Sequence, residues 1–277
     1  MKTKMLSTFA AAALLLWSSP VLAAESNEVA KELQELITKV QGKLKAGDRT
    51  EAALTDELKG FDALLEKHKA GKTDDVAQIL FMKAQLYLQV FDNSEKGVEL
   101  INQLKREFPD SKQGKNADKI LENVKKQEAA QKIRSTLIEG SKFPDFDEKD
   151  VEGKPFNLAA YKGKVVLVDF WATWCGPCVA ELPNVMKAYE KHHANGFEII
   201  GISLDSDQAK LDKFTKEKKL PWQQYFDGQG WNNKLSTKYG VNSIPATYLL
   251  DGEGKIIAKN LRGDDLEQAV AKALAKK

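Results

Sequence analysis

Residues 165–178 decide the fold of the second half of the chain, and they read VVLVDFWATWCGPC. The run 165–170 consists of β-forming, mostly apolar side chains, which predicts a buried strand. The Cys-Gly-Pro-Cys at its end opens a helical pattern, and Pro177 suits a first helical turn because it has no amide hydrogen to lose. This order places Cys175 at the exposed tip of the helix N-terminus and Cys178 one turn inside.

Cys175 and Cys178 are the only cysteines of the chain. A disulfide that closes so short a loop constrains the unfolded chain little, so we interpret the pair as a redox-active disulfide rather than a structural one. Backbone amides at a helix N-terminus stabilise a thiolate, so we expect Cys175 to attack and Cys178 to resolve. A zinc site is disfavoured because it needs about four ligands, and only the adjacent His192 and His193 follow.

Further short apolar runs and helical patterns alternate after residue 142. They predict strands at 165–170, 197–204, 247–250 and 255–258, and helices at 177–193, 208–219, 231–239 and 264–276. The last two strands flank Asp251-Gly252-Glu253-Gly254, which predicts a hairpin turn. Alternating strands and helices predict an α/β fold, a sheet covered by helices.

Two motifs in this half resemble those of the thioredoxin superfamily, specifically the extracytoplasmic TlpA/ResA-like reductases. The first is VDFWATWCGPC at 168–178, and the second comprises Tyr-Gly-Val at 239–241 and Ser-Ile-Pro-Ala-Thr at 243–247. The resemblance covers residues 141–277. It implies a thioredoxin-like fold, a central sheet flanked by helices, and thiol–disulfide exchange without metal, nucleotide or organic cofactor.

The resemblance also implies roles for two carboxyl groups. Asp169 matches the family's buried acid beneath Cys178; a carboxyl in an apolar sheet has a raised pKa and can exchange a proton with that cysteine. Glu181, one helical turn after Cys178, matches a carboxylate that ResA-like proteins keep near the site. A solvated helix residue is the alternative for Glu181.

Client binding is expected around the second motif and the active-site loop. Pro245 corresponds to the family's cis-proline, packed against the disulfide. The substrate-binding residues are then predicted to be Trp174, Gly176, Pro177, Ile244 and Pro245.

An insertion at 205–231 ends in a stretch, 222–231, that carries four aromatic residues. They are Trp222, Tyr225, Phe226 and Trp231. These side chains either line a substrate groove or pack the insertion onto the sheet.

The first half of the chain has a different pattern. Residues 1–23 have a basic start, an apolar run and a small-residue cleavage signal, which predicts a secretory signal peptide and a periplasmic or otherwise extracytoplasmic protein. Residues 24–138 predict an all-α domain of helical hairpins, followed by the thioredoxin-like domain at 139–277. The segment 92–111 resembles a tetratricopeptide-type helix pair.

The charge of the chain limits which partners we expect. Loss of residues 1–23 leaves 40 basic and 40 acidic side chains, which gives no reason to expect nucleic acid as a partner. We expect client proteins with disulfides, a membrane thiol as electron donor, and a protein partner for the helical domain.

Two other functions compete with this interpretation. A peroxiredoxin-like peroxidase would need Thr three residues before its cysteine, where this chain has Ala172. A helical adaptor with a passenger thioredoxin fold would not need the cysteines.

Overall fold

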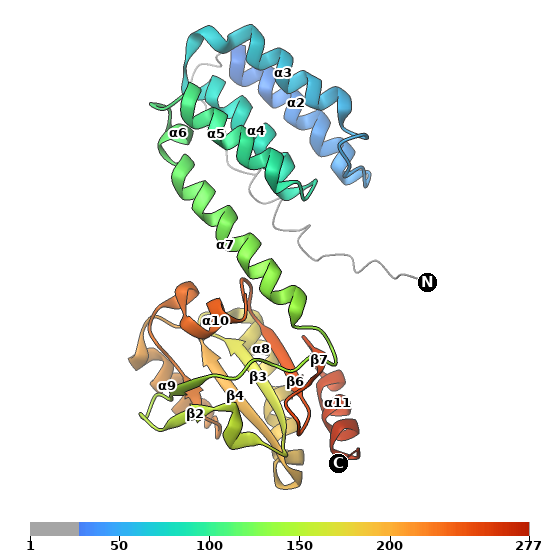
Figure 1. Cartoon of the computed structure of the whole chain (residues 1–277), viewed down its shortest axis with the longest axis vertical. Helices are drawn as coiled ribbons and strands as arrows, with labels where there is room; N and C mark the ends of the chain where they lie inside the picture. Colours follow the sequence, from blue (N-terminus) through green and yellow to red (C-terminus); the bar gives the residue numbers. More distant parts are fainter. Residues whose placement is uncertain (1–27, 277) are drawn as a thin grey trace. The chain divides into compact units, whose positions relative to one another are not determined.

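The computed structural model describes residues 28–276, so the predicted signal peptide lies outside the described residues. The described chain forms two compact units that divide after Lys126 (Figure 1). We call them the N-terminal unit and the C-terminal unit and describe each by itself. Between residues 28 and 276, no helix is both long and apolar enough to cross a membrane.

The N-terminal unit consists of helices that pack in neighbouring pairs, α2 with α3 and α4 with α5 (Figure 1). Short connections join the members of each pair, as expected for helical hairpins. The shared core contains fully buried side chains such as Val40, Phe61 and Leu86. The helices are α2 (Glu28–Lys45), α3 (Thr55–His68), α4 (Asp74–Gln89), α5 (Ser94–Glu107) and α6 (Lys112–Lys115).

Side-chain caps set where these helices begin. Thr73 caps α4, because its Oγ1 accepts a hydrogen bond from the Val76 amide. Asn93 caps α5, and the next residue, Ser94, is already helical. Both residues are good N-caps, and the side chain of Asn93 is the one that accepts the Lys96 amide.

The end of this unit contains a helix break and corrects one expectation. Ser111 caps only the short helix α6, and a new helix, α7 (Ala117–Thr136), starts after Asn116. The Asn116 side chain donates to the Lys112 carbonyl and so closes the short helix. The segment 92–111 was expected to hold a helix pair. It holds one helix, α5, whose 14 residues leave no room for a second helix in the segment. The hairpin partner of α5 is the preceding helix, α4.

The C-terminal unit contains a five-stranded mixed sheet flanked by helices, the thioredoxin-like arrangement predicted from the sequence (Figure 1). The central strand β3 runs parallel to β4 and antiparallel to β6. Across the sheet the strands are β5 (Gln224–Tyr225), β4 (Phe197–Ser203), β3 (Val165–Trp171), β6 (Ala246–Leu250) and β7 (Ile256–Lys259). The four predicted strands lie within one residue of these bounds at each end.

Both faces of the sheet are covered, which explains why every residue of β3 is buried. Val165 and Leu167 face the side of α8 (Gly176–His192) and α11 (Asp264–Leu274), and the alternating Val166 and Val168 face the other core. Because side chains alternate along a strand, Asp169 shares the α8 face with Leu167.

Three short strands were not predicted. β1 (Asp147–Lys149) and β2 (Pro155–Asn157) form a separate antiparallel pair, and β5 pairs with β4 over two residues. The predicted helix at 231–239 is also shorter. Asn233 interrupts it by capping α10 (Lys234–Lys238), because its Oδ1 accepts the amides of Leu235 and Ser236.

The last turns of α7 belong to the C-terminal unit. Ile133 packs against its core, the Arg134 guanidinium donates to the Gly240 carbonyl, and Leu137 just after the helix is 1% exposed. Gly240 has a φ of +64°, and a Cβ there would lie 2.4 Å from the Ala130 carbonyl oxygen. A glycine is therefore required where this helix meets the sheet domain.

Candidate active site

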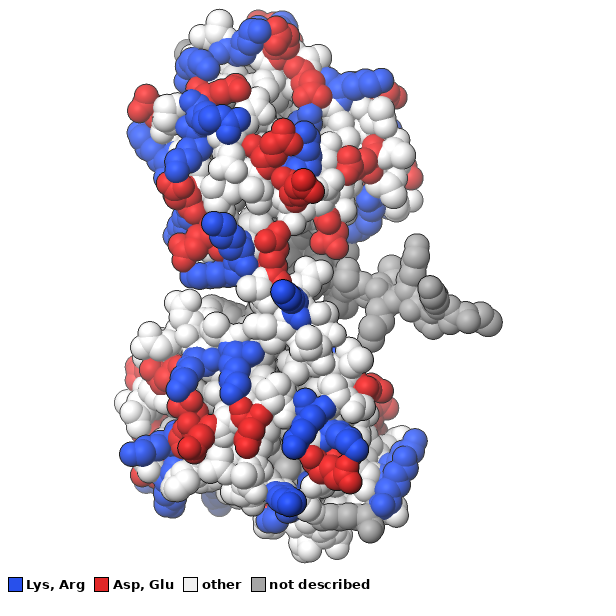
Figure 2. Space-filling view, viewed as in Figure 1, with Lys and Arg blue, Asp and Glu red and all other residues white. Residues whose placement is uncertain are grey.

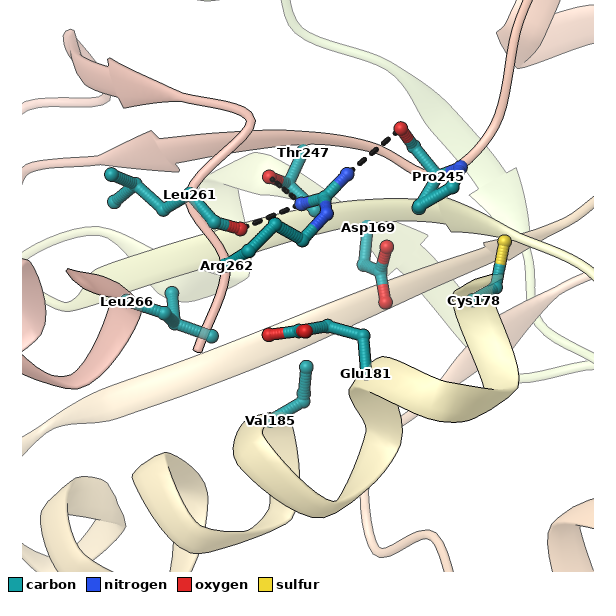
Figure 3. A pocket seen from close by; sticks show the side chains of 9 residues that line it. All are labelled: Asp169, Cys178, Glu181, Val185, Pro245, Thr247, Leu261, Arg262 and Leu266. Atoms are coloured by element: carbon teal, nitrogen blue, oxygen red, sulfur yellow. Dashed lines mark hydrogen bonds between the residues drawn. The ribbon is translucent and has the colours of Figure 1, made fainter. Parts of the chain in front are cut away.

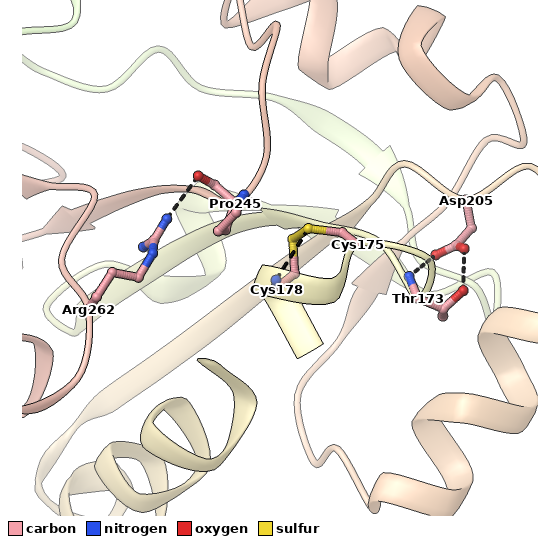
Figure 4. Close-up of a disulfide and its surroundings, with 6 residues drawn as sticks. All are labelled: Thr173, Cys175, Cys178, Asp205, Pro245 and Arg262. Carbon is pink, nitrogen blue, oxygen red and sulfur yellow. Dashed lines mark hydrogen bonds between the residues drawn. A yellow bond between two sulfur atoms is a disulfide. The ribbon is translucent and has the colours of Figure 1, made fainter. Parts of the chain in front are cut away.

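Cys175 and Cys178 form a disulfide at the start of α8 (Figure 4). β3 leads into the loop before it, and Cys175 is the N-cap of the helix. The Cys178 amide donates a hydrogen bond to the Cys175 sulfur over 3.2 Å. This amide is one of the unpaired donors of the first helical turn, so it favours negative charge on that sulfur after reduction.

The exposure of the two cysteines differs from the expectation. Cys175 was predicted to sit at an exposed tip, but in the disulfide it is 5% exposed, and Cys178 is 4% exposed. Both residues join the core cluster against which Ile244 packs. The neighbouring Trp174, in contrast, is 53% exposed.

The second motif lies beside the disulfide. The peptide bond between Ile244 and Pro245 is cis, as predicted. Pro245 lines the same small cavity as Cys178, and its carbonyl accepts a hydrogen bond of 2.8 Å from the Arg262 guanidinium (Figure 4). The two motifs, far apart in the sequence, therefore meet at the disulfide.

The small cavity behind Cys178 brings together the acids that the sequence singled out. Its volume is ≈ 10 Å³, about that of one water. In the view of Figure 3 the Asp169 carboxyl lies between Cys178 and Arg262, with Glu181 below it. The residues that line the cavity are Asp169, Cys178, Glu181, Val185, Pro245, Thr247, Leu261, Arg262 and Leu266.

Asp169 has the predicted raised pKa. Burial disfavours its charged form and raises the pKa from the ordinary 3.8 to about 7, while the Arg262 cation lowers it and the Glu181 carboxylate raises it. The residue is 7% exposed, and no described residue hydrogen-bonds its carboxyl group. A carboxyl with this pKa can take a proton from a neighbouring thiol near neutral pH.

Glu181 is not the solvated helix residue that was its alternative interpretation. It is half-buried and lines the cavity. One carboxylate oxygen accepts the Gly263 amide at 2.7 Å and the other accepts the Asn184 side chain at 3.2 Å. Glu181 therefore ties α8 to the loop before α11.

Arg262 is a site residue that the sequence did not reveal. It lies in the loop between β7 and α11, outside both motifs. Its guanidinium donates to uncharged oxygens, the carbonyls of Pro245 and Leu261 and the Thr247 hydroxyl. Thr247 lies directly opposite Asp169 in the neighbouring strand, so the cation is held over the acid without a direct ion pair between the two.

The four aromatic residues at 222–231 divide into two groups. Trp222 and Tyr225 are buried, and Phe226 packs against the core, so these three fasten the insertion to the sheet. Trp231 is 49% exposed and lies against Trp174, with ring centroids 5.9 Å apart.

A dithiol that closes into a disulfide at a helix N-terminus, beside a buried carboxyl group with a raised pKa, has the chemistry of a thiol–disulfide oxidoreductase. The comparisons with known proteins agree. The Redoxin family model matches residues 138–275. The thiol-disulfide oxidoreductase ResA of Bacillus thuringiensis subsp. konkukian is 33% identical over 137 residues, which are 50% of this chain and 77% of that protein.

Other matches cover the same share of the chain. ResA of Geobacillus thermodenitrificans is 32% identical over 138 residues, 49% of this chain and 78% of that protein. The thioredoxin domain of a thiol-disulfide oxidoreductase from Bacteroides vulgatus is 38% identical, with a TM-score of 0.46 over 49% of this chain and 97% of that structure. The chain belongs to the ResA-like thiol–disulfide oxidoreductases of the thioredoxin superfamily.

Proposed function

We propose that this protein is an exported reductase of protein disulfides whose redox centre is the pair Cys175 and Cys178. The observation that carries the proposal is the asymmetry between the two sulfurs. The Cys175 sulfur accepts a helix N-terminal amide, whereas Cys178 adjoins the cavity that contains Asp169. The first environment favours a nucleophilic thiolate, and the second supplies a base for the thiol that reacts later.

The reaction begins with the reduced protein. The Cys175 thiolate attacks one sulfur of a client disulfide, which forms a mixed disulfide and releases one client thiolate. Cys178 then gives its proton to Asp169 and attacks the Cys175 sulfur. This step releases the second client thiolate and closes the disulfide, so two electrons have passed from the dithiol to the client. We propose Glu181 as the second acid of the site. Its carboxylate accepts the Gly263 amide beside the cavity, and its negative charge raises the pKa of Asp169.

The Gly-Pro dipeptide between the cysteines supports the direction of electron flow. Gly176 and Pro177 are the dipeptide of thioredoxin, whose potential is near −270 mV, whereas the oxidant DsbA is near −120 mV. At about 30 mV per decade, this gap is roughly five orders of magnitude in equilibrium constant. A protein with this preference needs a source of electrons, for which we propose a membrane thiol donor.

Clients are proposed to bind at the loop and the cis-proline, through Trp174, Gly176, Pro177, Ile244 and Pro245. On the face in Figure 2, basic and acidic side chains are interspersed over each unit. A surface of mixed sign favours recognition of a protein segment over recognition of a polyanion.

The remaining parts of the proposal concern the rest of the chain. Residues 1–23 are proposed to direct export, 24–138 to form a helical domain with a protein partner, and 139–277 to form the redox domain.

Equilibration of the full exported protein with glutathione or dithiothreitol buffers tests the function. We expect a potential near −270 mV and reduction of insulin by the wild type but not by Cys175→Ser. A potential above about −180 mV, where disulfide isomerases lie, would contradict the reductase direction. Failure of the wild type to reduce any disulfide would contradict the function itself.

A further inference from the structure

We propose that Trp174 and Trp231 together form a docking surface for client proteins, one that binds an extended segment with an aromatic side chain next to its disulfide-bonded cysteine. The inference rests on the proposed function and specifies the client. We call the two side chains the tryptophan pair.

The tryptophan pair is unusual because of its exposure. Trp174 is 53% and Trp231 49% exposed, and they account for two of the three large apolar side chains exposed between residues 28 and 276. Their rings touch at a centroid distance of 5.9 Å and an angle of 57°. Tryptophan is enriched among the residues that carry most of the binding energy at protein interfaces, so two of them in contact on a surface indicate a binding site.

A buried polar network fixes the loop of Trp174. Asp205 accepts hydrogen bonds from the Thr173 amide at 3.0 Å and the Thr173 hydroxyl at 2.6 Å (Figure 4). The same carboxylate accepts the Ser203 hydroxyl at 2.8 Å. Asp205 is 3% exposed, so its charge is compensated by these donors rather than by water.

The loop of Trp231 is anchored at the same strand end. The Asn233 side chain, fully buried, donates to the Ser203 carbonyl at 3.2 Å and to Asp227 at 3.0 Å. Asp227 also accepts the amides of Gln229 and Lys234, on either side of Trp231. Ser203 thus connects both loops, so the backbone that carries the two tryptophans is held in place before any client arrives. Such preorganisation lowers the entropic cost of binding.

The position of the tryptophan pair identifies its occupant. Trp174 directly precedes Cys175, and disulfide exchange requires a client sulfur to come into bonding contact with the Cys175 sulfur. The residues next to the client cysteine must then pass over the pair. An aromatic side chain there stacks on exposed indole rings and is favoured over a small or negatively charged one.

The test uses the full mature chain and three substrates. Two are disulfide-linked peptides of the same sequence except for Trp or Gly beside the cysteine, and the third is 2-hydroxyethyl disulfide. We expect the wild type to prefer the Trp peptide to the Gly peptide in kcat/KM. Trp231→Ala should reduce this preference by about tenfold. Trp231→Phe should retain most of it, which separates docking from damage to the fold.

Ile138→Ala is the matched control, because Ile138 is the third exposed large apolar side chain and lies outside both loops. It should leave the peptide preference as in the wild type. An unchanged preference in Trp231→Ala, with both peptides reduced, would overturn the inference while the proposed function stands. A wild-type dimer that becomes monomeric in Trp231→Ala would overturn it as well, because a second copy would then cover the pair. If the wild type reduces none of the three substrates, the proposed function has failed.

Discussion

Asp169→Asn should stabilise the C-terminal unit at high pH and change its stability little at low pH. The folded-state pKa of Asp169 is about 7, above the ordinary 3.8 expected for the unfolded chain. Between these values the folded protein keeps a proton that the unfolded chain releases. Stability therefore falls as the pH rises through this window, and the full loss persists above about pH 7. At 1.36 kcal/mol per pKa unit, the loss reaches about 4 kcal/mol as an upper figure.

Urea unfolding of the oxidised, mature protein at pH 4 and pH 8.5 measures this difference. Tryptophan fluorescence is a selective probe, because every tryptophan after residue 27 lies in the C-terminal unit: Trp171, Trp174, Trp222 and Trp231. The free energy of unfolding of Asp169→Asn should exceed that of the wild type by several kcal/mol at pH 8.5 and by much less at pH 4.

Asp212→Asn is the matched control for this comparison, since Asp212 is an exposed residue of α9 (Gln208–Lys218). It should leave the pH dependence as in the wild type. If Asp169→Asn raised the free energy of unfolding by the same amount at both pH values, the reasoning would be refuted, because the stabilisation would then have no connection with ionisation. A loss of stability at pH 8.5 would refute it too.

Three further predictions concern the reaction and the export of the protein. Cys178→Ser should accumulate mixed disulfides with clients and Cys175→Ser should not, as seen on non-reducing gels; the opposite pattern would reverse the two roles. Arg262→Gln should shift the pH midpoint of the resolving step upward, because it removes the cation that lowers the pKa of Asp169. Stopped-flow kinetics with a mixed-disulfide substrate measure this midpoint, and an unchanged midpoint would contradict the prediction. The mature protein should begin at or next to Ala24, and an intact mass that still includes Met1 would contradict export through the predicted signal peptide.

The central strand and the redox pair could be predicted because their signals are local. A short apolar run before Cys-Gly-Pro-Cys is contiguous, and the cis-proline lies in a recognisable motif of its own. Strands β1, β2 and β5 were missed because they have only two or three residues each, too few for a period of two to be seen. The sequence also does not show whether Asn93 or Ser94 caps α5, because both side chains suit an N-cap position.

Arg262 could not be found because its role depends entirely on tertiary structure. It comes from a loop more than eighty residues beyond Cys178, and only the pairing of β3 with β6 places it over Asp169. The burial of Cys175 depends on tertiary packing, because both cysteines join the core cluster against which Ile244 packs. The exposure of Trp231, alone among the aromatic residues of the insertion, depends on how Asn233 and Asp227 fold its loop.

The family match and the folded redox domain begin at different residues, because the last turns of α7 pack on that domain. Similarity to relatives starts at residue 138, whereas the compact unit starts at Gln127 and includes Ile133 and Arg134. A fragment cut where the family match starts would expose the core that Ile133 covers and leave the Gly240 carbonyl without its guanidinium donor. The portion of the chain shared by descent and the portion that folds together are therefore not the same, and truncations designed from alignments alone would begin one helix segment too late.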